Sequence, residues 1–147
     1  MTKNSLIKKG NKIMETNNTN ATYNVTIANC SKELSKIERI AIKDTGDATP
    51  IDQVLDSVPD NFFVINVNYF AELQVHNEKA KGDTDYSVFL IVDNDGNKFC
   101  TSSTSFRDSF MSIANEMEGE PFSIKVFRKP SKNFSGKYFI SCSINIG

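Results

Sequence analysis

Aromatic and basic side chains alternate near the C-terminal end of the chain. From Phe122 to Lys129 the even positions Phe122, Ile124 and Val126 are apolar, and the odd positions are Ser123, Lys125, Phe127 and Lys129. In residues 137–146, Lys137 and Phe139 likewise lie opposite the apolar positions, and the connecting loop adds Lys132 and Phe134. If the two segments pair as strands, these rings and cations share one solvent-facing surface. Rings stack on nucleobases while cations follow phosphates, so the pattern favours binding of single-stranded nucleic acid.

The same residues also allow a purely structural interpretation. Phe127 and Phe139 would then pack under a loop or a helix, and the lysines would only keep the surface soluble. Under the binding hypothesis Arg128 adds a further phosphate contact. Tyr69 and Phe70, in the longest β-pattern of the chain, are additional candidates for stacking.

Charge distribution matters more here than the net charge of −1. Residues 21–60 carry four basic and seven acidic groups, whereas residues 121–147 carry five basic groups and no acid. A polyanion responds to the local field, so the acid-free C-terminal part remains a candidate for binding it.

The sequence contains no recognisable catalytic motif beside this pattern of rings and cations. His76 is the only histidine, and P-loop, G-x-G-x-x-G and G-x-S-x-G motifs are absent. Asp93-x-Asp95-Gly96 lacks the remaining ligands of a calcium loop and is typical of a tight hairpin. We therefore expect a non-enzymatic protein with no metal or cofactor. The chain has three cysteines, which is an odd number, and no C-x-x-C pair. Because the sequence also lacks a signal peptide, we expect reduced thiols in a cytoplasmic protein.

The pattern of elements predicts a mainly β fold. Residues 1–20 are polar and are expected to form a disordered leader, and residues 21–147 a single domain. Strands are expected at 37–43, 61–75, 86–92, 97–102, 122–129 and 137–146. In the long strand, odd positions from Phe63 to Val75 form one apolar face. A helical turn follows Thr49, its expected cap, and one amphipathic helix spans 105–118 with Ser105 as its cap. These elements suit a five- to six-stranded OB-like barrel with one capping helix.

From Ile37 onward, the chain resembles the small single-stranded-DNA-binding proteins of short-tailed phages with protein-primed replication. The residues that carry the resemblance are Lys81-Gly82-Asp83, Asp95-Gly96-Asn97-Lys98-Phe99, the Ser/Thr run 101–105 with the following helix, Pro121 to Val126, and Ser135 to Phe139. It implies an OB-like fold and sequence-independent coating of displaced strands in the host cell, alongside phage replication proteins. It also implies stacking by Phe99, the counterpart of an aromatic that follows the hairpin in that family.

A second hypothesis assigns the chain to a different class. Five aspartates between residues 44 and 60 could form an acidic surface that binds and inhibits a basic or DNA-binding host protein. These are Asp44, Asp47, Asp52, Asp56 and Asp60.

Overall fold

The computed structural model describes residues 23–146, so the expected leader lies outside the described part of the chain. The elements, in chain order, are β1 (Tyr23–Cys30), α1 (Lys36–Lys43), a 3₁₀ turn (Thr45–Asp47), β2 (Thr49–Pro50), α2 (Ile51–Ser57), β3 (Phe62–Asn77), β4 (Asp85–Asp93), β5 (Lys98–Thr101), α3 (Thr104–Met117), β6 (Phe122–Pro130) and β7 (Tyr138–Ile144). The prediction of a mainly β architecture is confirmed. Three α-helices are present in the described residues, whereas the sequence predicted one α-helix and one isolated helical turn.

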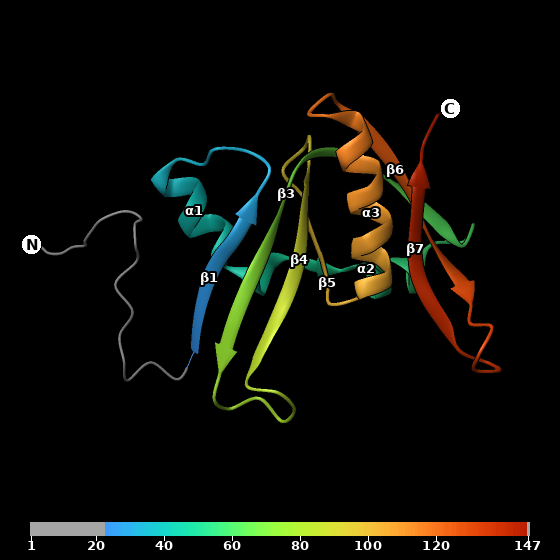
Figure 1. Ribbon diagram of the computed structural model, residues 1–147, viewed down its shortest axis with the longest axis horizontal. Helices are drawn as coiled ribbons and strands as arrows, with labels where there is room; N and C mark the ends of the chain where they lie inside the picture. The colour runs from blue at the N-terminus through green and yellow to red at the C-terminus, as the bar shows by residue number, and fades with distance from the viewer. Residues whose placement is uncertain (1–22, 147) are drawn as a thin grey trace, which may run out of the picture.

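The sheet curls into an open half-barrel that is consistent with an OB-like fold (Figure 1). Its strand order is β2-β5-β4-β3-β6-β7, with β1 as an additional partner of β3. All pairs are antiparallel except the short β2–β5 pair. Strand β3 is therefore the centre of the molecule: β4 pairs with one edge, and β6 and β1 share the other.

A β-bulge at Asn68 changes which side chains of β3 face the main core. The register with β4 shifts between Val67 and Tyr69. Before the bulge, the odd positions Ile65 and Val67 are buried in the main core. After it, Phe70 packs against this core, while Ala71 belongs to a different cluster. The prediction of one continuous odd-numbered face is therefore wrong, because one extra residue exchanges the two faces of a strand.

Helix α3 contributes two large aromatic rings to the main core and also covers the free edge of β7. Phe106 and Phe110 are fully buried among residues of α2, β3, β4, β6 and β7. On the side of α3 next to β7, the Ser105 hydroxyl donates to the Ile140 carbonyl at 3.0 Å. Ser109 and Ser141 hydroxyl oxygens lie 3.2 Å apart. Ser141, expected to face solvent, is thus buried because β7 is the strand beside the helix.

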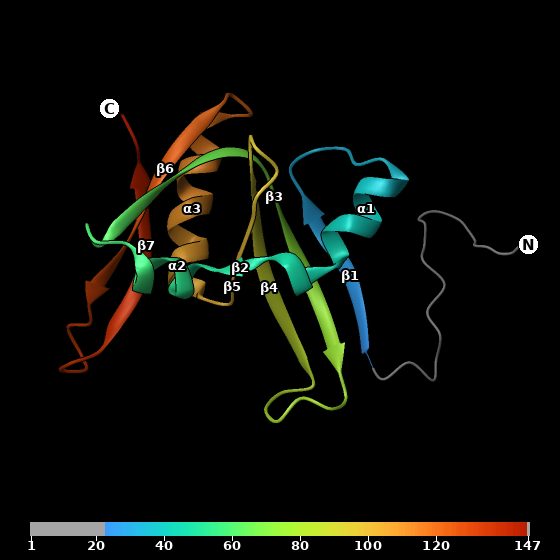
Figure 2. The same cartoon turned by 180° about the vertical axis from the view of Figure 1, so that it is seen from behind.

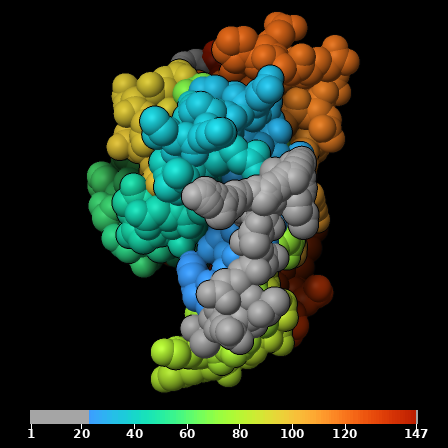
Figure 3. All heavy atoms as spheres, turned by 90° about the vertical axis from the view of Figure 1, so that its left-hand side faces the viewer, coloured from blue at the N-terminus to red at the C-terminus, as the bar shows by residue number. Residues whose placement is uncertain are grey.

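Helix α1 replaces the strand that we expected at 37–43. Ser35 and Glu38 form a capping box: the Ser35 hydroxyl accepts from the Glu38 amide, and the Glu38 carboxylate accepts from the Ser35 amide. This S-x-x-E spacing is a helix-start signal that competes with the alternation of isoleucines on which the predicted strand depends. Only Ile42 is buried, and α1 lies on the surface at the end of the molecule shown in Figure 3.

The caps of the other two helices also differ from the predicted ones. Helix α2 has Pro50 at its N-cap and no side-chain cap, since Thr49 instead pairs with Phe99 in the β2–β5 ladder. Helix α3 is capped by Ser103, whose hydroxyl accepts from the Phe106 amide at 3.2 Å. Ser105 is occupied by its bond to β7.

Candidate nucleic-acid interface

Strands β3, β6 and β7 carry a row of aromatic, aliphatic and basic side chains on one side of the sheet. We call this surface the outer face and define it as Phe62, Val64, Lys125, Phe127, Lys129 and Phe139. The ladders place Phe62 opposite Phe127, Val64 opposite Lys125, and Lys129 opposite Phe139. Directly opposed residues of antiparallel strands project to the same side, so the ladders assemble this face. Figure 2 shows the three strands β3, β6 and β7 that carry it.

The side chains of the outer face do not take part in the hydrophobic core. None of its six residues belongs to, or packs against, the three buried clusters of the described chain. Phe62 and Phe139 are each 37% exposed, and Val64 is 41% exposed. A set of large apolar side chains left on one sheet surface is an indication of a binding surface.

Two of the lysines lie over the rings of this face. The Lys125 ammonium nitrogen is 4.7 Å from the centroid of the Phe62 ring, and that of Lys129 is 5.8 Å from Phe127. These are cation–π distances. The two cations therefore lie beside the rings, so one ligand can contact a ring and a cation together.

The β6–β7 loop extends the outer face with exposed groups. Phe134 is 65% exposed, and Lys132 and Lys137 are exposed on the same loop. The loop is closed by hydrogen bonds from the Ser131 amide to the Lys137 carbonyl and from the Lys137 amide to the Phe134 carbonyl. Gly136 has φ +78°, which favours glycine at this turn.

Arg128 does not lie on the outer face, contrary to the sequence-based expectation. Its ladder partner is Ile140, a core residue, so its side chain leaves the sheet on the opposite side. There its guanidinium donates to Asp52 at 3.0 Å and to Asp56 at 2.9 Å on α2. These carboxylates raise the pKa of Arg128 and offset its charge. Its role is to tie β6 to α2.

The other aromatic candidates are also distant from this row. Phe99 is half-buried on the core side, with its ring 5.7 Å from that of Phe63. Phe70 packs against Phe110 at 4.9 Å. Tyr69 is half-buried under the Lys32 ammonium, 5.0 Å from its ring, and desolvation by burial is the main reason that its pKa is raised. The bulge at Asn68 explains the positions of Tyr69 and Phe70, because it exchanges the faces of the residues that follow it.

Phe62 and Val64 are members of the outer face that the sequence analysis missed. Both occupy even positions in a segment whose odd positions supply the core. Two large apolar residues at positions expected to be solvated were the available signal. It was overlooked because the following even positions, Asn66 and Asn68, are polar.

Other potentially reactive groups have local structural partners. His76 contacts Asp85 and Glu78 on the surface. Burial raises the pKa of Cys142 to about 12, and burial also raises that of Cys100. In residues 23–146 no group of three or more His, Cys, Asp or Glu side chains is placed to hold a metal ion.

None of the described helices combines the length and the apolar character required to cross a membrane.

Comparisons with protein-family models, curated proteins and solved structures produced no match for this chain.

Proposed function

We propose that this chain binds single-stranded DNA, without sequence preference, on the outer face. The observation that carries the proposal is a row formed by the exposed Phe62 and Phe139 and the half-buried Phe127, interleaved with Lys125 and Lys129. A ring accepts the flat face of any base, whereas ammonium groups neutralise phosphates. Phe134, Lys132 and Lys137 would continue the contact along the loop.

The composition of the strands supports an anionic ligand. Residues 121–147 contain no acid, and the outward positions of β3 in this region are Phe62, Val64 and Asn66. The one arginine of the hairpin is neutralised on the other side of the sheet. The outer face is therefore basic although the chain as a whole is slightly acidic.

With the resemblance to phage proteins, this activity corresponds to coating displaced strands during phage DNA replication. The protein would act in the host cytoplasm, beside phage replication proteins, and without catalysis, a metal or a cofactor. Coating requires many weak, base-independent contacts, which is what an aromatic and lysine row provides.

The alternative, inhibition of a host protein by an acidic surface, has less support. Asp47 pairs with Lys98 at 2.6 Å, and Asp52 and Asp56 pair with Arg128. Asp44 caps the 3₁₀ turn. At least four of the five aspartates thus have partners within the chain, which reduces the field available to attract a basic protein.

Fluorescence anisotropy with a labelled dT15 oligonucleotide tests the proposal. We expect binding that weakens steeply with added salt and that a fifteen-base-pair duplex does not compete away. Absence of binding at low salt would refute the proposal. Equal competition by the duplex would also contradict it, because stacked and paired bases do not present their faces to the rings.

A further inference from the structure

The edge of β3 shared by β6 and β1 contains a gap. The β6 ladder ends at Val67, opposite Phe122, and the β1 ladder begins at Ala71, opposite Cys30. Asn68, the bulge residue, has no partner in the ladders of the described strands. Ser31 closes only one end of the gap: it accepts from the Phe70 amide at 3.0 Å and donates its own amide to the Phe70 carbonyl at 2.9 Å.

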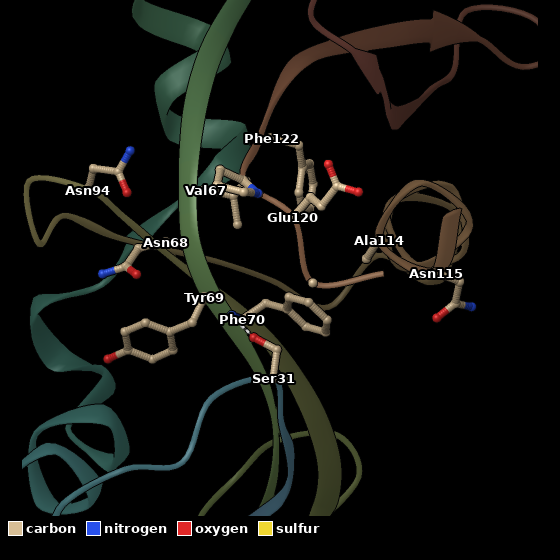
Figure 4. A pocket seen from close by; sticks show the side chains of 12 residues that line it. Ser31, Val67, Asn68, Tyr69, Phe70, Asn94, Ala114, Asn115, Glu120 and Phe122 are labelled. Atoms are coloured by element: carbon tan, nitrogen blue, oxygen red, sulfur yellow. Dashed lines mark hydrogen bonds between the residues drawn. The ribbon is translucent and has the colours of Figure 1, made fainter. Parts of the chain in front are cut away.

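A cavity of about 340 Å³ opens at this gap, between β3 and the C-terminal end of α3. We call it the notch. In Figure 4, Phe70 points from β3 towards Ala114 of α3, and Phe122 lies on the far side of the same space. The volume falls within the range of small-ligand sites. Apolar side chains from three elements therefore surround a space large enough for one planar ring.

The polar groups of the notch are mostly neutral. Asn68, Asn94, Asn115 and Ser31 are among its lining residues, and in Figure 4 the Asn68 and Asn94 side chains lie across β3 from Phe70. No lysine or arginine lines it among the described residues, and Glu120 is its one charged residue. Carboxamides both donate and accept hydrogen bonds, so they can pair with the edge of any base. A phosphate, by contrast, would meet the Glu120 carboxylate without a compensating cation.

The notch lies next to one end of the outer face. The Asn94 amide, at its rim, donates to the Asn66 carbonyl at 3.1 Å. Asn66 follows Val64 on the outward side of β3, and its side-chain oxygen accepts from the Ser123 hydroxyl at 2.6 Å. A strand that lies along the outer face towards Asn66 therefore runs towards Asn94, a residue that lines the notch.

We propose that the notch receives one nucleobase of the bound single strand, with its ring near Phe70 and Phe122. The inference rests on the proposed function, since the strand must first be held on the outer face. It assigns Phe70 a place at the binding site as the wall of a base pocket rather than as part of the exposed row.

The test combines NMR spectra of the full chain with dT15 affinity. The first probe is thymidine, which has no phosphate and so does not need the lysines. We expect it to shift the side-chain amide signals of Asn68, Asn94 and Asn115, also in the Lys125→Ala/Lys129→Ala variant. Asn115→Phe should fill the notch and remove these shifts. It should also weaken dT15 binding on the order of tenfold, as loss of one stacked base would. Ser112→Phe, an exposed position of α3 outside the notch lining, is the matched control.

The outcomes separate this inference from the proposed function. If dT15 binds with the expected salt dependence but thymidine shifts none of the three signals, the notch proposal is wrong and the outer-face proposal stands. Full dT15 affinity in Asn115→Phe also overturns it, with folding confirmed by thermal unfolding. If wild-type protein does not bind dT15, the proposed function fails, and with it the role of the notch in holding a strand.

Discussion

The ammonium group of Lys125 lies over the ring of Phe62, 4.7 Å from its centroid, across the β3–β6 pair. The ring comes from the first half of the central strand and the cation from the acid-free hairpin. Neither residue alone indicates a binding surface. Together they form a unit in which a base can take the ring while the lysine moves to the adjacent phosphate.

Replacing both lysines of the outer face should reduce the salt dependence of DNA binding. In Lys125→Ala/Lys129→Ala, two phosphate contacts are lost, so the slope of log K against log salt should become less negative by about 1.4 for a single strand. Anisotropy titrations with dT15 at several salt concentrations measure the slope. The control is Lys79→Ala/Lys81→Ala, an equal charge change at two exposed lysines of the β3–β4 loop. An identical slope in both double variants would exclude the outer face.

Phe127→Ala should affect binding more than folding. Its ring is half-buried and belongs to none of the buried clusters, so we expect loss of roughly 1–3 kcal/mol of binding free energy for one stacked base. Phe110→Ala, at the centre of the core, should instead lower the free energy of unfolding by about 3–5 kcal/mol. Urea denaturation and dT15 titration of both variants check this. If Phe127→Ala lowers the free energy of unfolding as much as Phe110→Ala does, the Phe127 ring is structural.

The ion pair between Glu72 and Arg107 should make stability depend on acidic pH. Two guanidinium nitrogens donate to the carboxylate at 2.6 and 2.7 Å and join α3 to β3. This hydrogen bonding lowers the pKa of Glu72 below its ordinary value of 4.5. A lowered carboxyl pKa stabilises the fold above pH 4.5, and that contribution disappears as the pH falls through the folded-state pKa.

Glu72→Gln tests this relationship. Because Arg107 is 37% exposed, we expect the variant to lose only about 1 kcal/mol of stability at neutral pH. The difference from wild type should shrink as the pH approaches 3. Urea denaturation between pH 3 and 7 measures it, and Asp108→Asn, at the longer 3.5 Å contact with Arg107, is the control. A difference that stays constant with pH would show that Glu72 acts through packing.

His76 should titrate above its ordinary value of 6.5. Its ring nitrogens contact Asp85 at 2.9 Å and Glu78 at 3.2 Å, and these hydrogen bonds raise its pKa. A raised histidine pKa stabilises the fold fully below pH 6.5, and the contribution is lost as the pH rises through the folded-state value. NMR titration of the imidazole measures the pKa. Asp85→Asn should lower it, because Asp85 is its main cause, whereas Asp83→Asn in the same loop should not. An unchanged pKa in Asp85→Asn would contradict this assignment.

Local patterns in the sequence determined the C-terminal hairpin, the Asp93–Gly96 turn and the position of α3. They also placed Lys125, Phe127, Lys129 and Phe139 on one side of the sheet. These features follow from repeats of two or 3.6 residues and from turn chemistry, which act between close neighbours in the chain. The S-x-x-E cap of α1 was equally local, so its misinterpretation was a choice between two short-range signals.

Only the tertiary structure decided what these side chains contact. Arg128 is drawn to Asp52, 76 positions away, and Phe62 joins Lys125 through a strand pair that no local repeat specifies. The bulge at Asn68 turns Phe70 towards Phe110. In each case the deciding interaction links residues far apart in sequence. Their partners depend on strand order and register, and a single inserted residue changes both the face and the neighbours of every residue after it.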